Sequence, residues 1–370
     1  MTPRAPSAHD ARITRAVAAW FEANARELPW RHRPDAARSA RSPRRDPYRS
    51  LVCEAMLQQT QVSRVTPRFV AFVERFPTVA SLAAADVHDV LEMWSGLGYY
   101  RRARHLHAAA RQIMAEFGGA VPQSVDDLRR LPGVGRYTAG SIASIVFGAP
   151  APIVDGNVAR VLLRIHGKDA PGDDPNTRAW LWERAASLAT AAAHPGVFNE
   201  GLMELGATVC TPAPSTPACD SCPVRGPCIA RRDRRQMDIP RPKPGTVRGD
   251  VFCASVLAVR HDGAVLLERR PETGMWAGMW QTPTAQRNDR APTRAEAARA
   301  ANLPARALVQ AASFEFLATH RRMEFTVFRA TPPRAFEPRR GEFVPPARAD
   351  RLPMSSPQRR ILRERPPSRV

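Results

Sequence analysis

The sequence contains no run of eighteen uncharged apolar residues, and its first dozen residues contain no apolar core. A membrane-spanning helix needs about twenty mostly apolar residues, and a signal peptide needs an apolar stretch of about seven to fifteen. The sequence therefore predicts neither feature. We expect a soluble cytoplasmic protein that makes no use of a membrane.

Acidic residues are scarce: 35 Asp and Glu stand against 55 Lys and Arg, which gives a formal net charge of +20. This excess favours a polyanionic partner, because every phosphate that Lys or Arg neutralises releases condensed counterions. Charge alone leaves DNA, RNA and an acidic membrane surface open, and an arginine-rich composition can also reflect genome bias. The choice among these partners has to come from motifs.

The chain of 370 residues is long enough for about two domains, and its periodicity changes once. Alanine-rich segments with helical periodicity recur first, and Asp46 followed by Pro47 predicts one helix start. From Asp250 the segments alternate as strands do, on both sides of a turn at 261–263. We predict a helical domain at 1–230, a basic linker at 231–249, a strand-containing domain at 250–345 and a basic, proline-rich, partly disordered tail at 346–370.

Residues 131–140, LPGVGRYTAG, have the form of a helix–hairpin–helix. Gly133 and Gly135 would let the backbone around Val134 approach a phosphate, and the N–H groups that lead into the next helix would donate to it. Such contacts fix a protein on DNA without reading its sequence. The alternative is an ordinary turn between helices, since a lone GxG is weak. No strand precedes the glycines, which disfavours a dinucleotide site.

Four of the six cysteines fall within nineteen residues: Cys210, Cys219, Cys222 and Cys228. In a cytosolic chain, clustering of this kind indicates a metal site more often than disulfides. The other two, Cys53 and Cys253, lie in apolar segments and are most simply buried thiols.

Several segments together resemble the MutY-type adenine DNA glycosylases of the helix–hairpin–helix superfamily. Besides the hairpin they are LPWR at 28–31, EAMLQQTQ at 54–61, WSGLGYYR at 94–101 and FNEGLMELG at 198–206. They span most of residues 20–230, and the family segment EVMLQQTQV differs at Ala55. The resemblance implies an all-α glycosylase domain with an iron–sulfur cluster loop, followed by an α+β MutT-like (Nudix-fold) domain.

The resemblance also implies the catalytic residues. The family's glutamate that protonates N7 of adenine corresponds to Glu54, and its catalytic aspartate after the hairpin corresponds to Asp155. Tyr137 and Asn157 match positions that hydrogen-bond the catalytic carboxylates and the substrate. A buried carboxylic acid can deliver a proton, and a nearby carboxylate can stabilise an oxocarbenium-like sugar. Taken alone, Glu54 would be a solvated surface charge and Asp155 a helix N-cap.

One residue separates two branches of the superfamily. Enzymes like endonuclease III carry a lysine after the hairpin whose amine attacks the sugar, whereas this chain has Tyr137. We therefore expect a monofunctional glycosylase that removes adenine opposite 8-oxoguanine or guanine. A glycosylase/lyase for oxidised pyrimidines is the closest rival. A catalytically silent DNA-binding iron–sulfur protein is the rival from another class, and the presence of both carboxylates argues against it.

The target adenine must leave the duplex before it is cut. Gln59 and Tyr99 match family residues that enter the base stack, while Trp30 and Arg31 match the family's pocket-side motif. Without the resemblance, Gln59 would be an ordinary helix surface residue and Tyr99 would equally be core packing. We expect a monomer that binds double-stranded DNA with the two mispairs and associates with the nucleoid.

The cysteine spacing C-x8-C-x2-C-x5-C is similar to the family pattern C-x6-C-x2-C-x5-C, which holds a 4Fe–4S cluster. The first loop is longer by two residues here, and a longer loop closes at little extra cost. The resemblance implies a structural 4Fe–4S cluster on Cys210, Cys219, Cys222 and Cys228. Zinc on the same four thiolates is the alternative.

The segment 251–283 resembles the MutT-like domain of the same family, which recognises 8-oxoguanine. A Nudix hydrolase needs a glutamate-rich helix for Mg²⁺, and the corresponding region offers only Glu296, so we expect no pyrophosphatase activity. The family's Phe-Ser-His loop aligns with Ala318, Thr319 and His320. The hydroxyl and the imidazole are kept and the aromatic ring is missing. An ordinary strand turn at Thr319 and His320 is the alternative.

Overall fold

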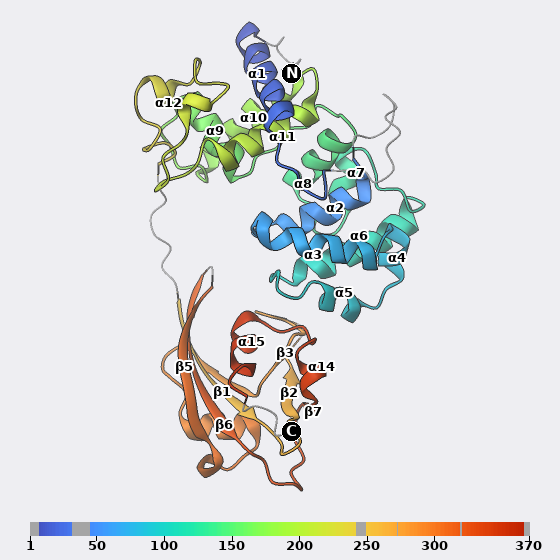
Figure 1. Cartoon of the computed structure of the whole chain (residues 1–370), viewed down its shortest axis with the longest axis vertical. Helices are drawn as coiled ribbons and strands as arrows, with labels where there is room; N and C mark the ends of the chain where they lie inside the picture. The colour runs from blue at the N-terminus through green and yellow to red at the C-terminus, as the bar shows by residue number, and fades with distance from the viewer. Residues whose placement is uncertain (1–6, 32–44, 242–248, 272, 319, 366–370) are drawn as a thin grey trace. The chain divides into compact units, whose positions relative to one another are not determined.

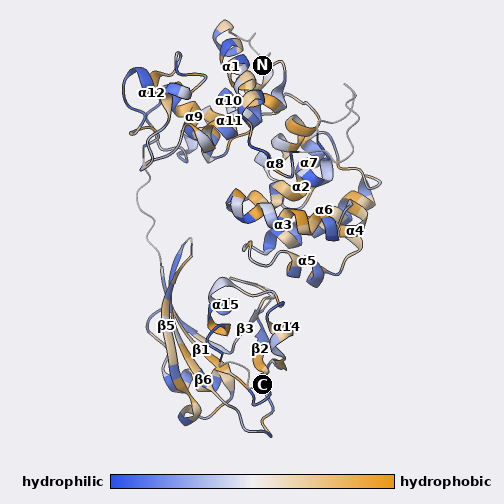
Figure 2. Ribbon diagram, in the orientation of Figure 1, coloured by the Kyte–Doolittle hydropathy of each residue, from blue (hydrophilic) through white to orange (hydrophobic). Residues whose placement is uncertain are grey.

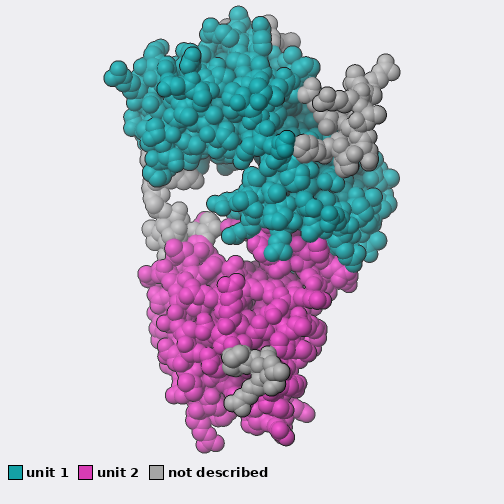
Figure 3. All heavy atoms as spheres, in the orientation of Figure 1, with its two compact units in different colours: residues 1–85, 102–244 teal, residues 86–101, 245–370 magenta. Residues whose placement is uncertain are grey.

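A computed structural model describes residues 7–31, 45–241, 249–271, 273–318 and 320–365. The chain forms two compact units, which are coloured separately in Figure 3. The first combines Met1–Ala85 with Arg102–Pro244, and the second combines Asp86–Arg101 with Gly245–Val370. Within the described ranges, no helix is long and apolar enough to cross a membrane.

All regular elements in the described part of the first unit are helices (Figure 1). Its helices are α1 (Ala8–Asn24), α2 (Pro47–Leu57), α3 (Val62–Arg75), α4 (Val79–Ala84), α6 (Arg101–Glu116), α7 (Val125–Arg130), α8 (Arg136–Ser141), α9 (Gly156–Ile165), α10 (Pro175–Ala191), α11 (Pro195–Thr208) and α12 (Ile229–Arg232). A π-helical segment, η1 (Ile142–Val146), continues α8, and a short 3-10 helix, η2 (Cys219–Ser221), lies in the cysteine loop.

Local signals fix the helix starts of the first unit. The side chain of Asp46 accepts a hydrogen bond from the Arg49 N–H at 2.7 Å, and Pro47 occupies the first turn of α2. This confirms the predicted start, since a proline there loses no hydrogen bond. Asp155 caps α9 in the same way, through the Val158 N–H. These caps place the first turns of α2 and α9.

One apolar core joins α1, α9, α10 and α11, and its fully buried residues include Ile13, Leu162 and Phe198. The helices carry hydrophobic and hydrophilic residues on different sides, as Figure 2 shows for α3. Such amphipathic helices bury their apolar side against one another. The helical prediction for this part of the chain is confirmed.

The second unit is built around two sheets. Its strands are β1 (Gly249–Ala258), β2 (Val265–Arg269), β3 (Trp280–Gln281), β4 (Thr284–Arg287), β5 (Val309–Leu317), β6 (Arg321–Ala330) and β7 (Glu342–Val344). One sheet has the order β4-β1-β6-β5, with β1 and β6 parallel, and the other has the order β3-β2-β7. The strands predicted on both sides of the turn at 261–263 are confirmed as β1 and β2, although they belong to different sheets.

Helices complete the second unit: α5 (Val87–Met93), α13 (Arg294–Ala301), the 3-10 turn η3 (Ala305–Ala307), α14 (Pro346–Ala349) and α15 (Ser356–Leu362). The tail was expected to be partly disordered, but α14 and α15 fold against the sheets. Ile361 and Leu362 are at most 2% exposed in a core with Val251 and Phe325. A few apolar residues among many Arg and Pro residues are enough to anchor a helix.

The first part of the predicted basic linker at 231–249 is not a linker in the structure. Its residues up to Arg241 belong to the first unit, because Arg235 and Arg241 pair with Asp169 at 2.7 and 3.2 Å. Ile239 is buried in the same core as α9. Residues 242–248 lie outside the described residues.

We predict that Leu362→Ala lowers the free energy of unfolding of the second unit by about 2–5 kcal/mol, because it leaves a cavity in a closed core. The measurement is urea unfolding of the full chain. The matched control is Arg363→Ala at the exposed neighbour, which should change stability by less than about 0.5 kcal/mol. Equal effects of the two substitutions would contradict the docking of α15.

Candidate active site

Glu54 lies on α2 with its carboxyl group only partly accessible to solvent. Ser141 on α8 donates a hydrogen bond to its Oε1 at 2.7 Å. Burial raises the pKa of Glu54 to about 7, against the opposing effects of the Ser141 hydrogen bond and the Arg45 charge. The charges of Asp155 and Glu200 add to the rise. A carboxyl group with this pKa is substantially protonated at neutral pH.

Asp155 sits at the N-terminus of α9. Its carboxylate accepts hydrogen bonds from the Val158 N–H at 2.7 Å and from Nδ2 of Asn157 at 3.2 Å. Burial raises the pKa of Asp155, while these hydrogen bonds oppose the rise by stabilising the ionised form. The aspartate is therefore both a helix N-cap and a half-buried carboxyl group, so the two interpretations of this residue are compatible.

The structure brings Glu54, Asp155 and Tyr137 together from α2, α9 and α8. The pKa of Tyr137 is raised well above its ordinary value, first by burial and then by the negative charges of Glu54 and Asp155. The charge of Asp155 also acts on Glu54. The two carboxyl groups therefore lie close enough to interact electrostatically.

Close backbone approaches at two glycines make this arrangement possible. A Cβ at Gly140 on α8 would lie 2.2 Å from the carbonyl oxygen of Pro152, in the segment that leads to Asp155. A Cβ at Gly206 on α11 would lie 2.6 Å from the Cβ of Asn157. Neither neighbour is the end of a flexible side chain, so any larger residue would push these segments apart.

Asn157 is held from its other side by Arg160. The guanidinium of Arg160 donates to Oδ1 of Asn157 at 2.9 Å, to the Gly206 carbonyl at 2.7 Å and to the Cys210 carbonyl at 2.7 Å. The start of α9 is thereby connected to the end of α11 and to the first cysteine of the cluster loop.

Two further acidic residues, Glu200 and Glu204, were not assigned a role from the sequence. They lie four residues apart on α11 and pair with arginines from the N-terminal region. Burial raises the pKa of Glu200, and its charge reaches both Glu54 and Tyr137. The FNEGLMELG segment contained both glutamates, so the signal was present in the motif.

The arginines of this network are Arg26, Arg31 and Arg45. Arg26 donates to Glu204 through Nε at 2.6 Å and Nη2 at 2.9 Å, and Arg31 donates to the same carboxylate at 2.9 Å. Arg45 pairs with Glu200. Burial would raise the pKa of Glu204, but the hydrogen bonds from the arginines lower it to about 2. Glu204 therefore stays ionised at any working pH.

The structure also places the remaining residues of the pocket-side motif. Trp30 is buried and packs edge-on against Phe69, with the ring centroids 5.5 Å apart. Arg31 lies over the ring of Phe21 and points into the acidic network of α11. Both side chains are engaged inside the protein, and their part in binding DNA stays a prediction.

The hairpin between α7 and α8 exposes its two glycines. Gly133 has a φ of +77°, and a Cβ there would lie 2.7 Å from the Cβ of His105 on α6. Val134 is buried, and its N–H closes the turn by donating to the Leu131 carbonyl at 3.1 Å. Gly135 forms the N-cap of α8 with open space around it. This hairpin therefore offers exposed backbone to a partner.

Gln59 and Tyr99 share an unusual backbone. Both side chains are exposed, and both residues have a positive φ, +54° for Gln59 and +48° for Tyr99. A non-glycine residue takes this conformation at a cost, and such residues are concentrated at functional sites. Gln59 follows α2 in the first unit, and Tyr99 belongs to the second. Their predicted entry into the base stack is untested.

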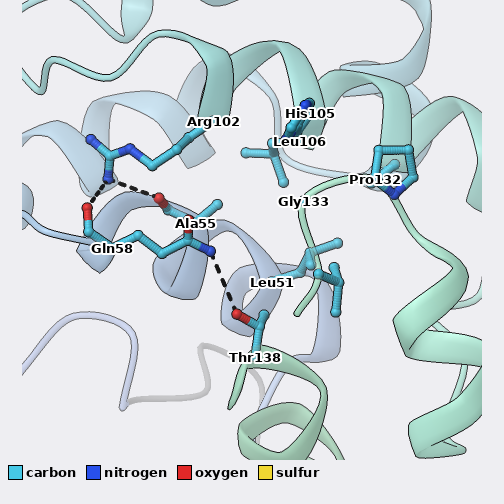
Figure 4. A pocket seen from close by; sticks show the side chains of 11 residues that line it. Leu51, Ala55, Gln58, Arg102, His105, Leu106, Pro132, Gly133 and Thr138 are labelled. Carbon is cyan, nitrogen blue, oxygen red and sulfur yellow. Dashed lines mark hydrogen bonds between the residues drawn. The ribbon is translucent and has the colours of Figure 1, made fainter. Parts of the chain in front are cut away.

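A small cavity of about 50 Å³, partly open to solvent, lies between α2, α6 and the hairpin (Figure 4). Its lining includes Gln58, Arg102, Gly133 and Thr138. None of the predicted catalytic side chains lines it. The cavity therefore borders the hairpin and is separate from the carboxyl groups.

The four clustered cysteines are free thiols: Cys210, Cys219, Cys222 and Cys228. Burial raises the pKa of Cys222 to about 12, and the charges of the other three add to it. Arg164 donates to Sγ of Cys210 at 3.3 Å, and its carbonyl accepts from Cys228 at 3.5 Å. Across the described ranges, no group of three or more His, Cys, Asp or Glu side chains forms a metal site. The four thiols nevertheless lie close enough for the charges of three of them to act on Cys222.

Ala318 and His320, whose predicted part in lesion sensing stays a prediction, lie between β5 and β6. His320 is exposed, and its carbonyl accepts the Gly249 N–H at 3.2 Å, whereas Thr319 lies outside the described residues. Glu296 forms the capping box of α13 with Thr293, and its carboxylate pairs with two arginines. The carboxylate therefore already has partners within the protein.

Comparison with known proteins agrees with these features. The model of the HhH-GPD superfamily of base excision DNA repair proteins matches residues 52–186, and that of the NUDIX domain matches residues 254–364. The first unit therefore contains a helix–hairpin–helix glycosylase fold, and the second has the Nudix (MutT-like) α+β fold. A solved thermostable thymine-DNA glycosylase is similar with a TM-score of 0.51 and 26% identity, over 61% of this chain and 98% of that chain.

Curated relatives are adenine DNA glycosylases. The protein of Homo sapiens is 36% identical over 72% of this chain and 56% of its own length. That of Buchnera aphidicola subsp. Schizaphis graminum is 32% identical over 71% of this chain and 72% of its own length. The chain covers between 47% and 60% of the length of the human, Arabidopsis thaliana, rat and mouse relatives.

We predict that Glu54→Gln stabilises the protein at neutral and alkaline pH. The pKa of Glu54 is about 7 in the folded state and near 4.5 in the unfolded chain, so wild-type stability falls as pH rises between these values. The variant lacks this loss and gains up to about 3 kcal/mol above pH 7. Urea unfolding from pH 4.5 to 8 measures the difference. Glu22→Gln, at an exposed site, is the control, and a pH-independent difference for Glu54→Gln would refute the shifted pKa.

Proposed function

Because the chain belongs to the family of adenine DNA glycosylases, we propose that it is a monofunctional DNA glycosylase. It hydrolyses the N-glycosidic bond of adenine opposite 8-oxoguanine or guanine in duplex DNA, as part of base excision repair. The observation that carries this proposal is the pair of Glu54 and Asp155. Their carboxyl groups interact electrostatically, and the pKa of Glu54 is raised to about 7.

Glu54 acts as the general acid. Adenine is a poor leaving group as an anion, so a proton has to reach it as the C1′–N9 bond breaks. The protonated Glu54 gives its proton to N7, and the bonding electron pair departs with the neutral base. A pKa near the working pH suits this transfer, because a sufficient fraction of the acid is protonated at the start.

Asp155 stabilises the sugar cation that remains. The hydrogen bonds from Val158 and Asn157 favour its ionised form, so that it faces the positive C1′ as a carboxylate. Water then adds to C1′ and loses a proton, which restores the protonated Glu54. The products are free adenine and an abasic site.

The scarcity of lysine supports the monofunctional character. The whole sequence contains two lysines, Lys168 and Lys243. Lys168 lies over the ring of Trp180, and Tyr137 occupies the position next to the carboxyl groups with its hydroxyl donating to Met203. Neither Tyr137 nor the carboxyl groups can form the Schiff base that β-elimination requires.

The four clustered thiols fit a 4Fe–4S cluster as its ligands. Four free cysteines in one loop region supply the all-thiolate donor set of such a cluster, and their charges act on one another. The cluster would supply cross-linking of the segment from Cys210 to Cys228. Arg231, Arg232 and Arg234 lie beside part of this loop, which supports a role for it in contacting DNA phosphates.

The exposed hairpin of β5 and β6 supports recognition of 8-oxoguanine. His320 at its tip can donate or accept a hydrogen bond. Without an aromatic ring at Ala318, we propose that polar contacts make the larger contribution to this recognition.

We predict single-turnover release of adenine from duplexes with 8-oxoguanine or guanine opposite, and little release opposite cytosine or thymine. The abasic product is converted to a strand break by alkali and is measured on a gel. Glu54→Gln should slow the reaction by at least about 100-fold, as expected for general acid catalysis. Glu22→Gln is the control.

Sodium borohydride tests the rival glycosylase/lyase on the same abasic duplex. Efficient covalent trapping of the wild-type protein would overturn the monofunctional assignment. Lesion binding without any abasic product, unchanged in Glu54→Gln, would instead identify a catalytically silent DNA-binding protein.

We predict that the purified protein contains iron and acid-labile sulfide in equal amounts, and that Cys222→Ser loses most of both. Elemental analysis and visible absorbance measure this. Cys253→Ala, at a buried cysteine of the second unit, should retain them. Stoichiometric zinc in place of iron would refute the 4Fe–4S assignment.

A further inference from the structure

Arg102 is bound to the turn that carries Gln59. It lies in the first turn of α6 with only 9% of its surface exposed. One guanidinium nitrogen donates to the carbonyl oxygens of Ala55 (3.0 Å), Met56 (2.7 Å) and Gln58 (2.6 Å), and the other donates to Oγ1 of Thr60 (3.1 Å). Figure 4 shows this guanidinium over the end of α2.

These hydrogen bonds end α2 and fix the turn after it. The last carbonyl groups of a helix have no partner within the helix, so a cation there satisfies and stabilises them. Gln58 is the C-cap of α2, and Thr60 comes two residues later. Gln59 is therefore flanked on both sides by residues that hydrogen-bond to the same guanidinium, while its own side chain is exposed.

The backbone of Gln59 needs such support. Its φ of +54° is in the left-handed region, which a non-glycine residue keeps only when its surroundings fix it. The cavity between α2, α6 and the hairpin is lined by Gln58 and Arg102, so packing on this side is incomplete. A further side-chain link, from Nε2 of Gln58 to Oγ1 of Thr138, is long at 3.5 Å. The four shorter Arg102 hydrogen bonds are thus the stronger constraint on this turn.

We propose that Arg102 is a positioning residue, which presents the Gln59 side chain in the conformation that enters the base stack as the target adenine leaves it. Arg102 itself touches neither the adenine nor the sugar. This inference rests on the proposed function, because it assigns Arg102 a part in the extrusion of the base.

A double-mutant cycle of Arg102→Lys and Gln59→Ala tests the proposal. A lysine ammonium is a compact point charge and cannot span the four acceptors as the planar guanidinium does. We expect Arg102→Lys to slow single-turnover excision by about tenfold in the wild-type background and by less than about twofold in the Gln59→Ala background. Extrusion is followed separately with 2-aminopurine in place of the target adenine, whose fluorescence rises on unstacking.

A purely structural role predicts a different result. Arg102→Lys would then slow excision and extrusion by the same factor in both backgrounds, and this outcome overturns the proposal. Arg359→Lys is the matched control, since its guanidinium also donates to three carbonyl groups, those of Ala349, Asp350 and Leu352. Its effect should be independent of Gln59.

Thr60→Val provides the second variant if urea unfolding shows that Arg102→Lys is not folded. It removes one acceptor of the same guanidinium, and its effect on extrusion should likewise depend on Gln59. If the wild type released no adenine, the proposed function would fail, but the 2-aminopurine signal would still report whether Arg102 and Gln59 are coupled.

Discussion

The structure depends on keeping a protonatable carboxyl group away from water beside a second carboxyl group. An ionised glutamate is destabilised by such burial, and Glu54 responds with a pKa of about 7. The surrounding helices have to approach one another closely for this to happen. Gly140 and Gly206, where a Cβ would meet neighbouring atoms at 2.2 and 2.6 Å, are the places where that approach occurs. The raised pKa of Glu54 therefore depends on the close packing of these helices.

The acidic pair on α11 gives a contrast within the same region. Glu204 receives hydrogen bonds from two arginines and stays ionised, whereas Glu54 receives one from a neutral serine hydroxyl. Both carboxyl groups are removed from water, yet the pKa of one falls to about 2 and that of the other rises to about 7. The charge of the hydrogen-bond partner, and not burial alone, therefore decides which carboxyl group can carry a proton at neutral pH.

Local features of the fold were predictable from the sequence. The start of α2 at Asp46 and Pro47 and the strands around the turn at 261–263 follow from short-range signals, and the structure confirms them. The candidate carboxyl groups, Glu54 and Asp155, came from a family resemblance, because a lone glutamate on a helix carries no functional signal. Their proximity is a product of tertiary packing between segments about a hundred residues apart.

Other features of the structure had no signal in the local sequence. The ion pairs of Arg26 and Arg31 with Glu204 join residues more than 170 positions apart, so no pattern along the chain announces them. The left-handed backbone of Gln59 is held by hydrogen bonds to Arg102, which is distant in sequence.

The near-absence of lysine has one more consequence. Of the 55 basic residues all but two are arginine, and a guanidinium keeps its charge throughout the range in which proteins are folded. The attraction to phosphate is thus nearly constant from mildly acidic to strongly alkaline solution, where an ammonium-based surface would begin to neutralise. Arginine side chains are also beyond the reach of amine acetylation, so neither alkalinity nor acetyl transfer would weaken the binding to nucleic acid that we propose.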